Sequence, residues 1–230
     1  MDALDKEREM NFKAAIFDMD GLLLDTENVC KGIFEKACEA LGVPFLEEKY
    51  LSIIGCNSKT IHAKLGEAYA GIIDYKVINE VWRQRYTSVV FHQAIPKKHG
   101  VIELLDWLTA KNIPIAVATS THRDVAEKKL KLAGLDGYFN CLATGCEVTR
   151  GKPDPEIYHL AAKRLGVASE HCMAFEDSNN GVKAAVAAAM HTYQVPDLVA
   201  PCEDVKALNV QTRTSLFEVY QELSASYLTR

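Results

Sequence analysis

Phe17-Asp18-Met19-Asp20-Gly21-Leu22-Leu23-Leu24-Asp25-Thr26-Glu27 is the stretch that decides the fold of this chain. It continues the apolar run 13–17, and such a run ending in acidic residues and a glycine predicts a buried parallel strand with a loop at its carboxyl end. Asp18 and Asp20 leave that strand as like charges, which repel unless a cation balances them. The segment therefore predicts the first strand of a sheet and a charged site at its end.

After Pro96 the chain alternates between strand-like and helix-like segments. Strands that alternate with helices of this length indicate βαβ units, and so an α/β, Rossmann-like fold: a mostly parallel sheet with helices on both faces. The expected strands are 114–119, 138–144, 172–175 and 191–195, and the expected helices are 100–111, 123–133, 155–165, 181–189 and, after a strand remnant, 216–223.

From residue 26 to residue 94 the pattern is helical. Apolar residues recur at helical spacing from Val29 to Leu41, stop near Gly42, and recur in 60–69 and 75–90. No convincing strand interrupts this region. We therefore expect an α-helical domain at 26–94, inserted into a core formed by 12–25 and 95–230.

Polar side chains follow three of the expected strands directly. In open α/β sheets the carboxyl ends of the strands form the edge where ligands bind, so these side chains are expected to meet there. Carboxylate oxygens suit Mg²⁺, and a hydroxyl with helix-start amides can hold a phosphate. The three clusters are Asp18-x-Asp20, Thr119-Ser120 and Glu176-Asp177.

Lys152 lies in the segment Gly151-Lys152-Pro153-Asp154-Pro155, where two prolines restrict the backbone. A lysine aimed in this way could pair with Asp18 and stabilise charge on a transferring phosphoryl group. Each feature alone has a commoner structural explanation: a solvated strand end, a helix N-cap, an acidic helix start or a surface lysine. Their coincidence at one sheet edge favours a catalytic site.

These four elements, in this order, resemble the motifs of the haloacid dehalogenase superfamily of phosphotransferases. The first motif is 17–27, the second Val117-Ala118-Thr119-Ser120, the third 151–155 and the fourth 175–181. The resemblance extends from Lys13 to about Pro196, and all four motifs in order are very specific. The inserted helices resemble the small α-helical cap of the β-phosphoglucomutase-like branch.

The resemblance implies a Mg²⁺-dependent phosphatase that hydrolyses small phosphate monoesters of sugars or nucleosides. Asp18 would be the nucleophile that forms an aspartyl-phosphate, and Asp20 the general acid and then the general base. The remaining implied roles are phosphate binding by Thr119, Ser120 and Lys152, and metal binding by Asp18, Asp177, Glu176 and the backbone carbonyl of Asp20.

The helical insert would select the substrate. Sugar-phosphate mutases of this branch typically carry a histidine where this chain has Cys30, and that histidine favours transfer to sugar over transfer to water. Cys30 therefore favours hydrolysis, with a β-phosphoglucomutase-like phosphomutase as the alternative. The candidate substrate contacts in the insert are Thr26, Asn57, Ser58 and Lys59, with the loop around Gly55.

Two other classes of protein fit the sequence less well. A haloacid dehalogenase proper usually lacks the second aspartate of the first motif, because no leaving alcohol needs a proton, so Asp20 argues against it. A non-catalytic binding module that kept the fold is disfavoured because Asp18, Asp20, Thr119, Lys152 and Asp177 are all present.

Composition restricts the partners. The formal net charge of -5 argues against nucleic acid as the main partner. The sequence contains no run of 18 apolar residues, so it predicts no membrane span, and the charged start 1–9 does not match a secretory signal. Seven cysteines without a Cys-x-x-Cys pair predict reduced thiols. We expect a cytoplasmic monomer that acts on a small phosphorylated metabolite.

Overall fold

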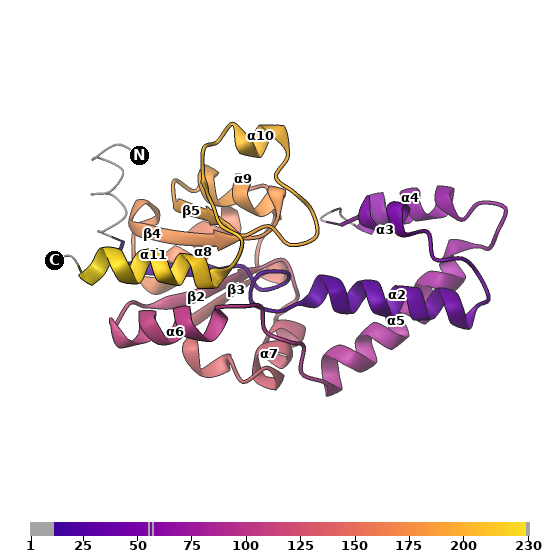
Figure 1. Ribbon diagram of the computed structural model, residues 1–230, viewed down its shortest axis with the longest axis horizontal. Coiled ribbons are helices and arrows are strands. Elements are labelled where there is room, and N and C mark those ends of the chain that lie inside the picture. The colour runs from indigo at the N-terminus through magenta and orange to yellow at the C-terminus, as the bar shows by residue number, and fades with distance from the viewer. Residues whose placement is uncertain (1–11, 55, 57, 229–230) are drawn as a thin grey trace.

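Six parallel strands form one sheet in the computed structural model, which describes residues 12–54, 56 and 58–228 (Figure 1). Their order is β3-β2-β1-β4-β5-β6, so β1 lies at the centre and the direction of winding reverses between β1 and β4. Such a reversal opens a crevice at the carboxyl ends of the two strands. The strands are β1 Ala14–Phe17, β2 Ile115–Thr119, β3 Cys141–Thr144, β4 Cys172–Glu176, β5 His191–Gln194 and β6 Gln211–Thr212.

Helices cover both faces of the sheet because successive strand residues point to opposite sides. Ala15 and Phe17 of β1 belong to one apolar cluster, and Ala14 and Ile16 belong to another. Residues of α6 (Val101–Ala110), α7 (Arg123–Leu132) and α11 (Leu216–Leu228) join the first cluster, and residues of α8 (Glu156–Leu165) and α9 (Asn179–Ala187) join the second. The α/β fold expected from the sequence is confirmed.

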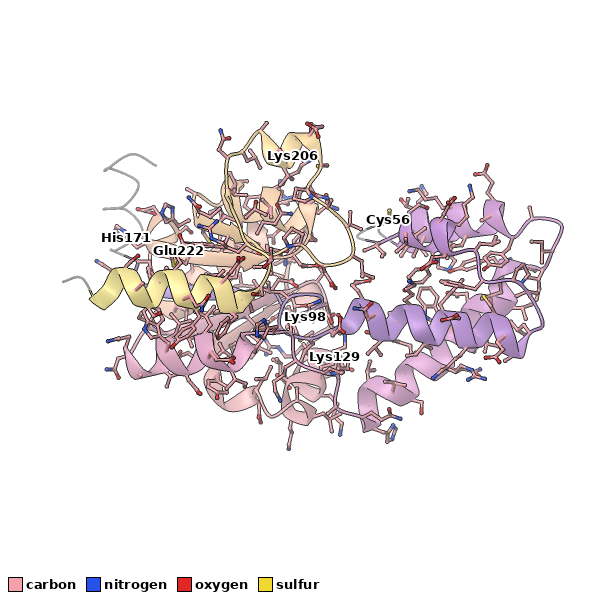
Figure 2. All side chains as sticks on the ribbon, in the orientation of Figure 1. Cys56, Lys98, Lys129, His171, Lys206 and Glu222 are labelled. Carbon is pink, nitrogen blue, oxygen red and sulfur yellow. The ribbon has the colours of Figure 1, made fainter. Side chains whose placement is uncertain are left out.

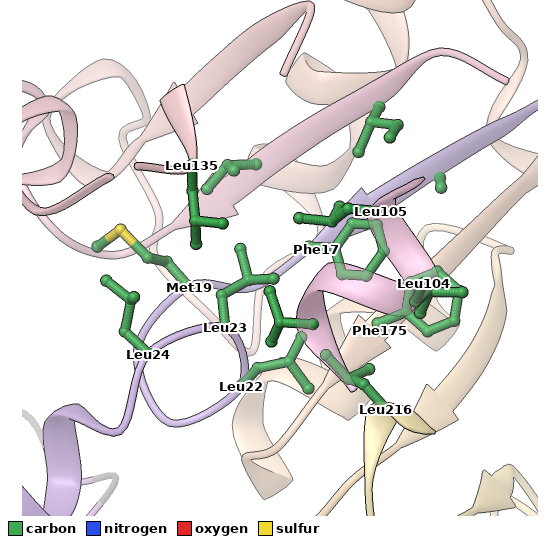
Figure 3. Close-up of a cluster of buried hydrophobic side chains, with 14 of the residues drawn as sticks. Phe17, Met19, Leu22, Leu23, Leu24, Leu104, Leu105, Leu135, Phe175 and Leu216 are labelled. Atoms are coloured by element: carbon green, nitrogen blue, oxygen red, sulfur yellow. The ribbon is translucent and has the colours of Figure 1, made fainter. Parts of the chain in front are cut away.

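The loop after β1 is anchored in the first cluster (Figure 3). The rings of Phe17 and Phe175 stack with their centroids 4.5 Å apart, between neighbouring strands of the sheet. Met19 and the run 22–24 that follows it are fully or almost fully buried in the same cluster. The backbone around Asp18 and Asp20 is therefore held from both sides by apolar contacts.

Four helices between β1 and α6 gather around an apolar cluster of their own. In Figure 1 α2 and α5 run side by side away from the sheet, with α3 and α4 beside them. Phe34 of α2 is fully buried at the centre, 5.0 Å from the ring of Trp82 and 5.1 Å from that of Tyr50. The helices are α2 Thr26–Ala40, α3 Glu47–Leu51, α4 Ser58–Ala68 and α5 Tyr75–His92.

Several boundaries differ from the sequence-based expectation. The expected strand 138–144 begins only at Cys141, because Asp136–Tyr138 form a 3-10 turn. Helix α9 starts two residues early, because the Ser178 hydroxyl caps it by accepting from the Gly181 backbone amide. Short helices α3 and α10 (Glu203–Lys206) were not expected, and the strand remnant is β6, which pairs with β5. None of the described helices is both long and apolar enough to cross a bilayer.

Replacement of Phe34 by alanine should lower the free energy of unfolding by about 3–5 kcal/mol, because it leaves a cavity among aromatic rings that cannot collapse. Urea denaturation followed by tryptophan fluorescence measures the loss. Ile72→Ala is the control, since Ile72 is 48% exposed and its truncation should change stability by no more than about 0.5 kcal/mol. Equal effects of the two changes would contradict a tightly packed helical insert.

Candidate active site

The register of the central strands brings the expected polar residues to one edge of the sheet. Phe17 pairs with Phe175 of β4 and Val117 of β2, so Asp18 follows β1 beside Glu176. The Asp18 backbone amide donates to the Phe175 carbonyl at 3.0 Å and fixes this alignment. A cavity of about 240 Å³ opens at this edge, lined by Asp18, Asp20, Glu27, Ile54, Ser120, Lys152, Asp177, Ser178, Asn179, Asn180, Asp197, Leu198 and Val199.

Lys152 is a buried cation at this edge, with only 7% of its side chain exposed. Its ammonium donates to Asp18 Oδ1 at 2.6 Å, to Glu176 Oε1 at 2.5 Å and to the Ala118 carbonyl at 3.0 Å. Burial alone would lower the pKa of Lys152, but the charges of Asp18 and Glu176 outweigh it and raise that pKa above its usual range. The lysine therefore stays charged and fixed against the Asp18 carboxylate.

Glu176 is fully buried and its carboxylate is saturated with hydrogen bonds. Oε1 also accepts from the Tyr158 hydroxyl at 2.8 Å, and Oε2 accepts from the backbone amides of Asp177 and Ser178 and from the Ser178 hydroxyl. A carboxylate offers about four acceptor sites, so little capacity remains for a metal ion. A Cβ at Gly181 would lie 1.8 Å from Oε1, so the first turn of α9 can pack against Glu176 only as glycine.

Asp20 is held at both of its carboxylate oxygens. The Lys129 ammonium donates to Oδ1 at 2.7 Å, and the Thr121 hydroxyl donates to Oδ2 at 2.6 Å. Burial raises the pKa of Asp20, but the charge of Lys129 reverses this effect, so that the pKa lies below its usual value. Asp20 thus lies at the cavity as an ionised carboxylate in a fixed position.

The acidic residues fit a divalent cation. Oxygen atoms of Asp18, Glu176 and Asp177 lie within 4.8 Å of one another, and Asp18 and Asp177 are the two that also line the cavity. Burial raises the pKa of the Asp18 carboxyl to about 8 against the opposing charge of Lys152, and burial also raises that of Asp177. A hard cation would relieve this crowding, because oxygen-rich carboxylate clusters are the ligands that Mg²⁺ and Ca²⁺ prefer.

Asp197 adds a further acceptor beside this cluster. Its side chain is 6% exposed, and Oδ1 accepts from the Lys98 ammonium at 2.6 Å. Oδ2 is buried and has no hydrogen-bond partner among the described residues. Oδ2 lies close to Gly21, whose φ of +88° and contact with Asp177 leave no room for a Cβ. An orphaned carboxylate oxygen here is suited to accept a hydrogen bond from a water molecule on a cation.

Four expected site residues whose side chains are described do not line the cavity, namely Thr26, Thr119, Glu176 and Lys59. Thr119 is 1% exposed, and its hydroxyl lies 3.5 Å from Asp20 Oδ2, whereas Ser120 lines the cavity itself. Thr26 is buried at the start of α2, and its hydroxyl donates to the Leu24 carbonyl at 3.5 Å. Lys59 is exposed on α4. Asn57 and the side chain of Ser58 lie outside the described residues, as does Gly55.

Four residues of the site escaped the sequence analysis. Glu27 and Asp197 line the cavity, and Tyr158 and Lys129 hold Glu176 and Asp20. Only Lys129 had a usable signal: it follows Ala126 by three residues on the apolar stripe of α7, where a lysine needs a partner. Glu27 belongs to the first motif itself, whereas Tyr158 and Asp197 are brought to the site by contacts between segments far apart in the sequence.

A parallel α/β sheet with carboxylates and a buried lysine at its carboxyl edge has the kind of site that phosphoryl-transfer enzymes use for positioning and charge neutralisation. The model of the haloacid dehalogenase-like hydrolase family matches residues 15–195. The chain belongs to that family.

Relatives with described activities share most of the chain. A phosphorylated carbohydrates phosphatase of Thermotoga maritima is 35% identical over 199 residues, 85% of this chain and 89% of the relative. A Drosophila melanogaster protein provisionally named a pseudouridine-5′-phosphatase is 33% identical, over 79% and 80% of the two chains. A solved Thermotoga maritima structure, provisionally named a β-phosphoglucomutase, superposes with a TM-score of 0.78 at 30% identity, covering 93% of this chain and 99% of that one.

Replacement of Glu27 by glutamine should stabilise the metal-free protein at high pH. Burial raises the pKa of Glu27 from 4.5 to about 7, and the charges of Asp20 and Asp197 contribute. The folded chain therefore holds this proton more tightly than the unfolded chain, and the stability of the native protein falls as pH rises from 4.5 to 7. At pH 8 the free energy of unfolding of Glu27→Gln should exceed that of the wild type by about 1–2 kcal/mol, and this difference should be smaller at pH 5.

Urea denaturation in EDTA at both pH values measures this gap. Glu39→Gln on the same helix is the matched control, because Glu39 is exposed and its change should stay within about 0.5 kcal/mol. A gap for Glu27→Gln that does not change between pH 5 and pH 8 would contradict the raised pKa.

Proposed function

We propose that the chain is a Mg²⁺-dependent phosphatase that hydrolyses small phosphate monoesters, with sugar and nucleoside phosphates as the substrate class. The observation that carries the proposal is the position of Asp18 at the cavity, with its Oδ1 on Lys152 and acidic neighbours that fit a cation. The names of the two phosphatase relatives support the same class of substrate.

In the first half-reaction a carboxylate oxygen of Asp18 attacks the phosphorus of the ester. Asp20, which is ionised in the ligand-free protein, takes up a proton as the anionic ester binds beside it, because added negative charge favours the protonated form. The bond from phosphorus to the ester oxygen breaks, and Asp20 donates that proton to the departing oxygen to give a neutral alcohol. Lys152 balances charge on Asp18 and on the phosphoryl oxygens beside it. The Ser120 side of the cavity, next to the start of α7, is the phosphate-binding region.

In the second half-reaction water attacks the phosphorus of the aspartyl-phosphate. Asp20, now ionised, accepts a proton from that water, and the bond between Asp18 and phosphorus breaks. Inorganic phosphate leaves, and both aspartates return to their starting states. The charge of Lys129 holds the pKa of Asp20 below its usual value, which keeps this carboxylate ionised and able to accept a proton.

A bound Mg²⁺ would neutralise charge on the phosphoryl group and hold it in line with Asp18. Asp18 and Asp177, which line the cavity, are the proposed side-chain ligands, with the backbone carbonyl of Asp20. Glu176 is reassigned to holding Lys152, since its oxygens already accept five hydrogen bonds. Asp197 would accept from a metal-bound water.

The helices of 26–94 are proposed to be the cap that selects the leaving group. Ile54 is the described residue of the α3–α4 connection that reaches the cavity, while Glu27 lines it from α2. The cavity carries carboxylates on this side, so an uncharged, hydroxyl-bearing leaving group fits better than one with a second phosphate. Residues 26 and 57–59 stay candidates for substrate contacts.

Water is the proposed acceptor of the phosphoryl group. Cys30 lies half-buried on α2, and burial together with Glu27 raises the pKa of its thiol to about 12. A thiol that stays neutral carries no proton to or from a sugar hydroxyl at neutral pH. The phosphomutase named for the solved neighbour remains the second candidate function.

Substitution of Asp18 by asparagine should abolish phosphate release. The amide keeps the shape but cannot attack phosphorus, and we expect a loss of roughly 10³-fold or more, as for other groups that act as a unit. Phosphate release over a panel of phosphate esters with Mg²⁺, repeated in EDTA, is the measurement, and EDTA should also abolish turnover. Undiminished turnover by Asp18→Asn would rule out Asp18 as the nucleophile.

Incubation with β-glucose 1-phosphate and a trace of glucose 1,6-bisphosphate distinguishes hydrolysis of the ester from the phosphomutase reaction. We expect inorganic phosphate to appear in ³¹P spectra, because Cys30 offers no proton relay to a sugar acceptor. Conversion to glucose 6-phosphate without release of inorganic phosphate would establish the phosphomutase instead.

A further inference from the structure

Lys129 is a buried lysine at the junction of the sheet domain and the inserted helices (Figure 2). Its side chain is 2% exposed, although it lies on an amphipathic helix with other lysines that reach solvent. Lysine is almost never fully buried unless it is paired. The first partner is Asp20, 2.7 Å from the ammonium, in a segment that is 109 residues away in the sequence.

The second neighbour of Lys129 comes from the inserted helices. Its ammonium lies over the ring of Tyr86, 5.4 Å from the centroid, within the range of a cation–π contact. Tyr86 is on α5, which packs against α7. Lys129 therefore contacts one element of the catalytic edge and one element of the insert at the same time.

Asp20 depends on this lysine for its orientation. Gly21 follows it directly, and 24% of the Asp20 side chain is exposed to the cavity, so apolar packing does not lock its carboxylate. Thr121 holds one oxygen and Lys129 holds the other, which fixes the plane of the carboxyl group. Positioned donors and acceptors gain most of their effect from being held within about 0.5 Å of the productive geometry.

We propose that Lys129 is a positioning residue that aims the Asp20 carboxyl at the leaving-group oxygen and couples this aim to the inserted helices through Tyr86. This inference rests on the proposed phosphatase function, in which Asp20 gives a proton to the departing oxygen as its bond to phosphorus breaks. A displacement of α5 that removes Tyr86 changes the environment of Lys129, and Asp20 then loses its fixed orientation.

The competing explanation is that Lys129 only balances a buried charge. Both explanations predict some loss of stability when Lys129 is removed, so stability alone does not separate them. They differ in their dependence on the leaving group. An alkyl phosphate releases a poor leaving group that needs a proton, whereas p-nitrophenyl phosphate releases a stable phenolate that does not.

Lys129→Met tests the proposal, with kcat/KM measured for p-nitrophenyl phosphate and for the best alkyl ester among glucose 6-phosphate, glycerol 1-phosphate and uridine 5′-monophosphate. Measurement of each variant at its own pH optimum removes differences in protonation state. We expect kcat/KM for the alkyl ester to fall about tenfold or more beyond any fall for the aryl ester, since general acid catalysis contributes ~10²–10⁴-fold. Asp20→Asn should show the same selective loss for the alkyl ester. Lys129→Arg should keep most of the wild-type kcat/KM for that ester.

Tyr86→Leu supplies a test from the insert and keeps the proposal falsifiable should Lys129→Met fold poorly. It should lower alkyl-ester turnover selectively, by a smaller factor. Lys131→Met on the exposed side of α7 is the matched control and should behave as the wild type. Equal losses for alkyl and aryl esters, or no loss, would overturn the positioning role. Turnover by the wild-type protein would leave the phosphatase proposal standing in that case. A wild-type protein without turnover of any ester would overturn both.

Discussion

The buried ion cluster of Lys152 with Asp18 and Glu176 is the interaction on which the site depends. Moving charges out of water costs several kcal/mol per ion, and only close pairing with full hydrogen bonding offsets that cost. Here the ammonium contacts both carboxylates, and Glu176 is completed by Tyr158 and the start of α9. The register of β1 against β4 brings these groups together, so the sheet and the charge cluster require one another.

Carboxyl groups outnumber cationic side chains around the cavity. Three lysines accompany six carboxyl groups, and burial raises the pKa of Asp18, Asp177 and Glu27. Such crowding opposes stability in the absence of ligands, and it is relieved when a cation and a phosphate ester enter together. Strain of this kind is typical of catalytic sites, where function is gained at the expense of local stability. The three lysines are Lys98, Lys129 and Lys152, and the six carboxyl groups are Asp18, Asp20, Glu27, Glu176, Asp177 and Asp197.

Side chains of the inserted helices contact the catalytic edge of the sheet, so the two parts are joined by more than the connecting chain. Glu27 opens α2 and lines the cavity, and Tyr86 of α5 covers the lysine that holds Asp20. The packing of the insert around Phe34 gives it an apolar core of its own. Movement of this unit against the sheet would therefore reach Asp20 through Tyr86 and Lys129, which would link the proposed substrate selection by the insert to the proposed proton transfer by Asp20.

The sequence alone determined the central features of this protein. Strand and helix periodicity predicted the parallel sheet and the helical insert, since burial on both faces of a sheet imposes continuous apolar runs. The carboxyl ends of those runs located Asp18, Asp20, Ser120 and Asp177, because polar residues that directly follow parallel strands must lie at one edge. The family resemblance then supplied their expected roles.

Only the tertiary structure decided how the remaining residues are used. Lys129, Tyr158 and Asp197 reach the site from segments without a recognisable motif, because their positions depend on how helices and loops pack over the sheet. The same packing saturates Glu176 with hydrogen bonds and turns Thr119 toward Asp20. Periodicity identifies which side chains are buried, but the pairing of buried polar groups is a property of three-dimensional contacts that no local pattern encodes.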